Sequence, residues 1–163
     1  MRIIAVDPGY ERLGVAILDK EEKGKEILVF SDCIQTAKTL PHAKRLAELG
    51  LALDKIIEEF KPEALCVETL FFAKSVTSAL KVAEARGVIL HAAARKGIEV
   101  KEFSPMDIKI AVTGHGKSDK TQVIAMVGRL IKISKPIKYD DEYDAIACGL
   151  TFFAHFRPSY PQK

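Results

Sequence analysis

Acidic side chains follow two apolar segments of the chain at the points where those segments end. Residues 2–6, RIIAV, lead into Asp7, and residues 64–67, ALCV, lead into Glu68. Both segments have the β-branched and apolar character of short buried strands. Functional groups in α/β proteins gather at strand ends, where a rigid backbone fixes their direction. Each acid also has a plainer interpretation, because Asp7 precedes the turn residues Pro8-Gly9 and Glu68 could be a charge at a helix entry.

A third acidic segment, residues 140–144 (DDEYD), comes directly before the apolar residues Ala145-Ile146-Ala147. Acids are favoured at the start of a helix by the helix dipole, and that alone could explain them. Asp141 and Asp144 are three residues apart, however, so a helix places both on one face. There they could point together at a cation.

Four carboxylates in one crevice would repel one another, and some would be protonated unless positive charge were present. Asp7, Glu68, Asp141 and Asp144 therefore predict a site for one or two Mg²⁺ ions, for which Mn²⁺ could substitute. Such a pair of ions can activate a water and stabilise the leaving oxygen in phosphodiester cleavage. The expected chemistry is metal-dependent hydrolysis of nucleic acid.

Other motifs give weaker indications. The loop Gly114-His115-Gly116-Lys117-Ser118 is not a P-loop, because Ala111 stands where the first glycine is required and a helix, not a strand, is predicted before it.

Residues 7–14, DPGYERLG, are similar to the phosphate loop of actin-like ATPases and sugar kinases. That alternative needs further nucleotide-binding motifs and a second domain, for which 163 residues leave no room. The histidines have no metal-ligand spacing, and no Ser or Cys lies in a nucleophile motif.

Composition and charge fit a globular protein that binds nucleic acid. The chain is 48% hydrophobic and 29% charged, which excludes a disordered tail. Residues 95–138 hold ten Lys or Arg against four acids, so this segment carries +6 and the remainder −3 of the net +3. A basic segment of this kind suits a phosphate backbone, although solvated helices can look similar.

The three cysteines predict buried thiols. The first apolar run is too short for a signal peptide, so we expect a cytoplasmic protein.

The remaining pattern predicts the elements that must position these residues. Strands are expected at 2–6, 14–18, 27–34, 64–67 and 98–103, with the first three in an antiparallel meander. Long helices are expected from 41 to 61, from 76 to 95 and from 141 to 155, with Gly97 ending the second. A short helix is expected after Pro105, and another runs from a capping box of Asp119 and Gln122 to about residue 131. This order predicts an α/β fold, a five-stranded mixed sheet with helices on both faces, in one domain of residues 1–156. We expect residues 157–163 to be a loose tail.

Taken together, these motifs resemble the RuvC family of Holliday junction resolvases across almost the whole chain. The segments that carry the resemblance are DPG at 7–9, VE at 67–68, FFAK at 71–74, SALK at 78–81, ARGV at 85–88, GxGxxxK at 114–120 and DxxDAIA at 141–147. No single motif identifies the family, but the occurrence of all of them in this order and at this spacing does. The resemblance implies an RNase H-like nuclease fold, a homodimer, and magnesium-dependent nicking of two strands of like polarity in a four-way DNA junction during recombination and repair.

Carried over residue by residue, the resemblance makes Asp7, Glu68, Asp141 and Asp144 the catalytic and metal-binding acids, with Asp140 a neighbour that binds no metal. It places the junction-contacting residues in two segments. The aromatic contacts are Phe71 and the adjacent Phe72, the basic contacts are Lys109 and Lys120, and Lys74 and Lys117 are added because a positive groove needs several phosphate contacts. Many relatives lack His115 and Lys117, and no role follows for these two.

Two other functions and three partners also follow from this reasoning. The alternatives are a junction-binding scaffold that has lost catalysis, which the intact acid set opposes, and an RNase H-like nuclease of RNA precursors. The expected partners are four-way junction DNA, a second copy of the chain that pairs partly through residues 76–95, and a branch-migration motor complex. The apolar residues of that helix could instead pack only on the sheet. They are Leu80, Val82, Val88, Ile89 and Leu90.

Overall fold

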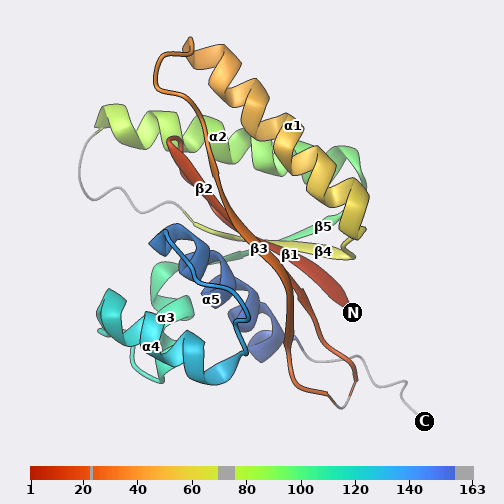
Figure 1. The fold of residues 1–163 in the computed structure, drawn as a ribbon, viewed down its shortest axis with the longest axis vertical. Coiled ribbons are helices and arrows are strands. Elements are labelled where there is room, and N and C mark those ends of the chain that lie inside the picture. Colours follow the sequence, from red (N-terminus) through yellow and green to blue (C-terminus); the bar gives the residue numbers. More distant parts are fainter. Residues whose placement is uncertain (23, 70–75, 157–163) are drawn as a thin grey trace.

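A twisted five-stranded sheet forms the centre of the protein (Figure 1). The computed structural model describes residues 1–22, 24–69 and 76–156. The strands are β1 (Arg2–Asp7), β2 (Arg12–Asp19), β3 (Ile27–Gln35), β4 (Ala64–Glu68) and β5 (Glu99–Phe103). Their spatial order is β3-β2-β1-β4-β5. β1, β2 and β3 form the expected antiparallel meander, and β4 and β5 extend it in parallel from β1, so the predicted mixed sheet is confirmed.

Helices cover both faces of this sheet, as Figure 1 shows. On one face lie α1 (His42–Phe60) and α2 (Val76–Arg95), and on the other lie α3 (Pro105–Thr113), α4 (Lys120–Leu130) and α5 (Asp140–His155). The alternating side chains of β1 divide between two cores, with Ile4 and Val6 facing α1 and α2 and Ile3 and Ala5 facing α5. Each central strand is therefore buried on both sides, which explains its almost continuous apolar sequence.

The helix boundaries follow local signals in the sequence. The predicted capping box of α4 is confirmed, because Asp119 accepts a hydrogen bond from the Gln122 amide while the Gln122 side chain accepts one from the Asp119 amide. α1 ends at Lys61, which adopts a left-handed conformation with φ of 49° before Pro62. α5 begins at Asp140, one residue before the predicted start, and its N-cap residue Tyr139 makes no side-chain capping bond.

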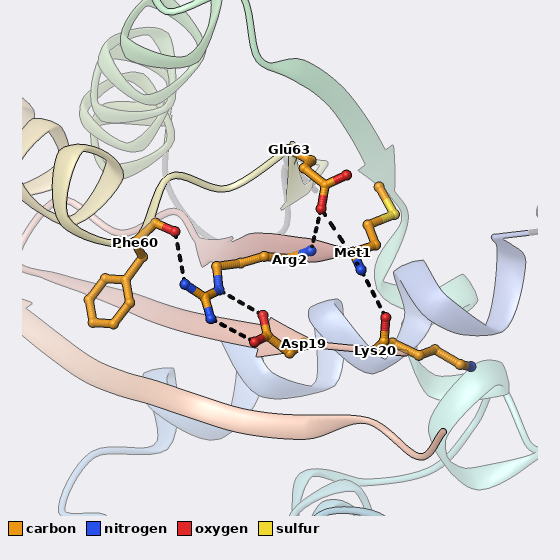
Figure 2. Close-up of polar contacts among 6 residues, drawn as sticks. All are labelled: Met1, Arg2, Asp19, Lys20, Phe60 and Glu63. Atoms are coloured by element: carbon orange, nitrogen blue, oxygen red, sulfur yellow. Dashed lines mark hydrogen bonds and ion pairs between the residues drawn. The ribbon is translucent and has the colours of Figure 1, made fainter. Parts of the chain in front are cut away.

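Ion pairs close the end of the sheet at which β1 begins, opposite the end that carries Asp7 (Figure 2). The Arg2 guanidinium donates two hydrogen bonds of 2.7 Å to Asp19 on β2 and a third, of 3.2 Å, to the Phe60 carbonyl at the end of α1. Glu63 accepts a hydrogen bond of 2.8 Å from the Arg2 amide. These contacts fix β1 between β2 and the entry to β4.

Two findings concern the remaining expectations. Within the described residues, no helix is long and apolar enough to cross a membrane. All three cysteines, Cys33, Cys66 and Cys148, are buried thiols as predicted. The expected tail at 157–163 lies outside the described residues.

Candidate active site

Asp7 and Glu68 lie side by side because they end neighbouring parallel strands. β1 and β4 are in register with Val6 beside Val67, so the next residue of each strand is one of the two acids. The backbone hydrogen bonds of the ladder fix both Cα positions. The sequence predicted that both acids end strands and share a crevice, and the structure adds that their strands are parallel neighbours. Two carboxylates thus meet at one edge of the sheet.

The first turn of α5 brings Asp141 and Asp144 to the same edge. Gly14 on β2 pairs with Asp7, and the main chain of α5 passes directly over it. A Cβ atom at Gly14 would lie 1.9 Å from the Asp141 carbonyl oxygen and 3.3 Å from the Asp7 Cβ. Only glycine therefore permits this approach, which places the helix that carries two acids against the strand end that carries the third.

Two cationic side chains lie among these acids. The Lys120 ammonium, at the start of α4, lies 2.5 Å from Asp140 Oδ2 and 2.9 Å from Asp144 Oδ2. On the other side, Arg12 Nε lies 3.1 Å from Asp141 Oδ2, and its guanidinium also reaches Asp140 at 3.6 Å. Asp140 thus lies between the two cations, and it is more exposed than Asp141 or Asp144.

The pKa shifts separate the four predicted acids from Asp140. Burial, followed by the charges of Asp144, Glu68 and Asp141, raises the pKa of Asp7 well above its ordinary value. Burial, followed by the charge of Asp144, raises the pKa of Glu68 to about 7. Burial is also the largest cause of the raised pKa values of Asp141 and Asp144. The hydrogen bond from Lys120 instead lowers the pKa of Asp140. Of the five described acids at this edge, these four share the like-charge repulsion and burial typical of a functional cluster, and Asp140 does not.

A shallow hollow of about 260 Å³ adjoins the acids. Glu68, Asp144, Lys109 and Lys120 supply its charged lining, and Pro105, Ile108 and Val123 supply the apolar lining. A larger hollow of about 470 Å³ lies at the opposite end of the sheet, beside the Arg2–Asp19 pair of Figure 2. Arg2 and Asp19 pair with each other there, whereas Glu68 and Asp144, two acids with raised pKa values, line the smaller hollow, so we place the chemistry in the smaller one.

The acids suit a hard divalent cation in donor type and in charge. Within residues 1–22, 24–69 and 76–156, no three Asp, Glu, His or Cys side chains are close enough together to hold one ion as they stand. Two observations nevertheless fit a cation. Repulsion from three neighbouring acids adds to the raised pKa of Asp7, and the buried Asp141 Oδ2 has no hydrogen-bond partner, since Arg12 is near it but not aligned. A divalent ion would relieve both conditions.

The predicted DNA contacts divide into three groups. Lys109 and Lys120 line the hollow with Glu68 and Asp144, so the structure brings them to the acids. Lys117 is exposed in the loop between α3 and α4, with no observation that connects it to the acids. The remaining predicted contacts, Phe71, Phe72 and Lys74, lie outside the described residues.

Sequence reasoning missed several residues that shape this site. Arg12 was one arginine among many, and its pairing with Asp141 depends on how β2 meets α5. Gly14 gave a better signal, because a glycine inside an apolar strand often marks a close approach of another backbone. The pairing of Asp140 with Lys120 had no signal in the sequence.

Comparisons with known proteins agree with this geometry. A family profile described as crossover junction endodeoxyribonuclease RuvC matches residues 3–152. The chain is similar to the RuvC protein of Prochlorococcus marinus, with 42% identity over 151 residues that cover 93% of this chain and 97% of that protein. It is also similar to the RuvC protein of Thermotoga petrophila, with 41% identity over 90% of this chain and 88% of that protein.

A solved structure gives the same result. The chain is similar to Thermus thermophilus RuvC in complex with a Holliday junction substrate, with a TM-score of 0.88, 29% identity, and coverage of 95% of this chain and 94% of that one. With the five-stranded mixed sheet and its two helical layers, this likeness confirms the predicted RNase H-like fold.

Proposed function

The chain belongs to the RuvC family of crossover junction endodeoxyribonucleases, and we propose that it resolves four-way DNA junctions through a metal-dependent site made by Asp7, Glu68, Asp141 and Asp144. Resolution of a Holliday junction requires hydrolysis of one phosphodiester bond in each of two strands. The observation that carries the assignment is the convergence of four acids with raised pKa values at one edge of the sheet, beside Lys109 and Lys120.

Each part of the site has a distinct role in this proposal. The four carboxylates would hold one or two divalent ions, with Mg²⁺ the expected ion and Mn²⁺ a substitute. Bound there, such ions supply an activated water and stabilise the leaving oxygen. Lys109 and Lys120 lie on the α3 and α4 side of the acids and would bind the phosphates that flank the cut bond. Because Lys120 is paired with Asp140 and Asp144, it must exchange those partners for phosphate when DNA binds.

The test replaces each acid by its amide, which keeps the shape and removes the charge. We expect Asp7→Asn, Glu68→Gln, Asp141→Asn and Asp144→Asn each to nick a synthetic four-way junction slower by orders of magnitude in Mg²⁺ while still binding it. Asp140→Asn is the matched control and should keep its activity, because Asp140 neighbours the site but shares none of the raised pKa values. Nicking that disappears in Asp140→Asn and persists in Asp141→Asn would refute the assignment.

The same assay decides between the two other functions. A junction that is bound but never cut by the wild-type protein in Mg²⁺ or Mn²⁺ would indicate a scaffold. Faster cleavage of structured RNA than of a junction or a linear duplex would indicate an RNA nuclease. We expect the junction to be the preferred substrate.

A homodimer belongs to this proposal, because one active site cuts one strand and a junction needs two symmetric cuts. The described part of α2 leaves room for such an interface. Ile89 is buried in the core and Leu90 packs against it, so these two serve the sheet, whereas Leu80 remains 59% exposed. A monomeric mass at micromolar concentration, both with and without junction DNA, would contradict the dimer. Binding to a branch-migration motor complex stays a prediction. A pull-down of the purified motor proteins with this chain would test it.

A further inference from the structure

A buried polar cluster lies directly behind the candidate active site, on the other side of the first turn of α5. Glu142 is 4% exposed, and its Oε1 atom accepts a hydrogen bond of 2.6 Å from the Ser31 hydroxyl. Lys135 Nζ lies 2.7 Å from the same oxygen and donates a hydrogen bond of 2.6 Å to the Ser31 carbonyl. β3 therefore meets two much later segments at one carboxylate: the segment directly before α5 and α5 itself.

The position of Glu142 in the helix gives this cluster its significance. Successive residues of an α-helix point about 100° apart, so Glu142 faces β3 while Asp141 and Asp144, three residues apart, face the strand ends of β1 and β4. The first turn of α5 has no side-chain cap at Tyr139. Glu142 instead attaches this turn to β3 and to the segment before α5, through Ser31 and Lys135.

A role in stability explains the cluster poorly. The Glu142 carboxylate is buried while the Lys135 side chain stays 46% exposed, so the desolvation cost falls on Glu142. The attraction of its partners often only balances such a cost, and apolar replacements are commonly neutral or stabilising. What such a pair does give is a defined geometry, because a buried carboxylate that loses its partners is strongly penalised. The first turn of α5 is thus held from behind by Ser31 and Lys135 and limited in front by the close contact with Gly14.

We propose that Glu142 is a positioning residue, which fixes Asp141 and Asp144 for metal binding and nicking by tying the first turn of α5 to Ser31 and Lys135. This inference rests on the proposed function of those two acids. It makes Glu142 neither a metal ligand nor a DNA contact.

The test removes the contacts of Glu142 with Ser31 and Lys135 without leaving a buried charge. In the double variant Lys135→Met/Glu142→Met both partners become apolar chains of similar length, so we expect a thermal midpoint close to that of the wild type. We expect unchanged junction binding and a single-turnover nicking rate at least about 10-fold lower, since a misplacement of about 1 Å can cost about 100-fold. Glu142→Gln, whose amide oxygen can still accept both hydrogen bonds, should restore nicking to within about threefold of wild type.

A second measurement needs neither metal nor DNA. The amides of residues 144–146 bond to carbonyls of the first turn, so their hydrogen exchange reports how firmly that turn is held. In the double variant these amides should exchange faster, while the second half of α5 keeps its protection. The matched control is Lys96→Met/Glu58→Met, which removes an ion pair of the same 2.7 Å length between the C-terminal side of α2 and α1. This control should change neither the nicking rate nor the hydrogen exchange of residues 144–146.

Each result has a definite meaning. Wild-type nicking together with wild-type exchange at 144–146 in the double variant would overturn the positioning role. If the double variant fails to fold, Ser31→Ala decides, because it removes only one hydrogen bond and must still slow nicking and speed exchange in the first turn. If Asp141→Asn nicks at the wild-type rate, the proposed catalytic site is wrong, and the exchange measurement still tests the tie itself.

Discussion

Gly14→Ala is the substitution that tests most directly whether α5 must lie where it does. The new Cβ would lie 1.9 Å from the Asp141 carbonyl oxygen and 2.5 Å from its carbon, whereas real contacts of a Cβ essentially never fall below 3.0 Å. The gap must therefore open by about 1.1 Å, the difference between 3.0 and 1.9 Å. Since the obstructing atoms belong to the main chain, no side-chain rotation relieves the clash, and the first turn of α5 has to move away from β2.

This displacement should affect catalysis more than stability. Overpacking a core contact typically costs about 1–3 kcal/mol, and at about 2–4 °C per kcal/mol the thermal midpoint falls by several degrees. A shift of about 1 Å in Asp141 relative to Asp7, by contrast, should reduce the nicking rate by about 100-fold. Junction binding should persist, because Lys109 and Lys120 lie on α3 and α4.

The assay is single-turnover nicking of a four-way junction at saturating Mg²⁺, at a temperature where circular dichroism shows each variant to be folded. The control is Gly128→Ala in α4, where an added Cβ meets nothing within 4 Å. A glycine in a helix interior costs about 0.5–1 kcal/mol relative to alanine, so this variant should be slightly more stable and fully active. A folded Gly14→Ala protein that nicks within about threefold of wild type would refute the reasoning.

Three further predictions concern charge and backbone conformation. Lys109→Ala and Lys120→Ala should each weaken junction binding and lower the slope of log K against log salt by about 0.9, and salt titrations with unchanged slopes would exclude phosphate contacts. Burial first, and the charge of Asp144 second, raise the pKa of Glu68 from 4.5 to about 7, so folding favours its protonated form. Its contribution to stability in the metal-free protein is then fully present below about pH 4.5 and lost as the pH rises through about 7. Thermal midpoints measured in chelator should show this loss in the wild type and a smaller loss in Glu68→Gln, in which Asp7 and Asp144, whose pKa values are also raised, still titrate. Lys61→Gly should raise the thermal midpoint by about 2–4 °C, because Lys61 holds a φ of 49° that glycine adopts without strain, and a lower midpoint would contradict this.

Most of the fold was predictable because its signals are local. Apolar runs that end at Asp7 and Glu68 marked two central strands, and the steps of three and four residues from Leu46 to Phe60 marked α1. The meeting of Asp7 with Glu68 was expected because both end strands, where functional groups gather, and the shared face of Asp141 and Asp144 followed from helical spacing; the parallel pairing of the two strands came from the structure. These inferences need only the chain's own periodicity.

The remaining features of the site depend on tertiary packing. Arg12 pairs with Asp141, and Ser31 pairs with Glu142, across long stretches of sequence. Helical periodicity separates Glu142 from Asp141 and Asp144, but it does not show that Glu142 is buried or that it contacts Ser31 on β3. Such contacts are fixed by where α5 crosses the sheet, and that position follows from core residues such as Ala145 and Ile146.

The order of the strands also bears on when a newly made chain could cut DNA. β1 forms its antiparallel hairpin with β2 soon after synthesis, but its parallel partner β4 arrives only after β3 and α1, and α5 is the last helix of the described fold. Nonlocal pairings of this kind form late, and a chain grows at about 5–20 residues per second. A nascent chain that has not yet reached Asp141 and Asp144 holds two of the four acids on an unfinished sheet. With the site as proposed, a chain whose C-terminal helix has not yet docked cannot nick DNA, so the nuclease activity begins only once α5 is in place.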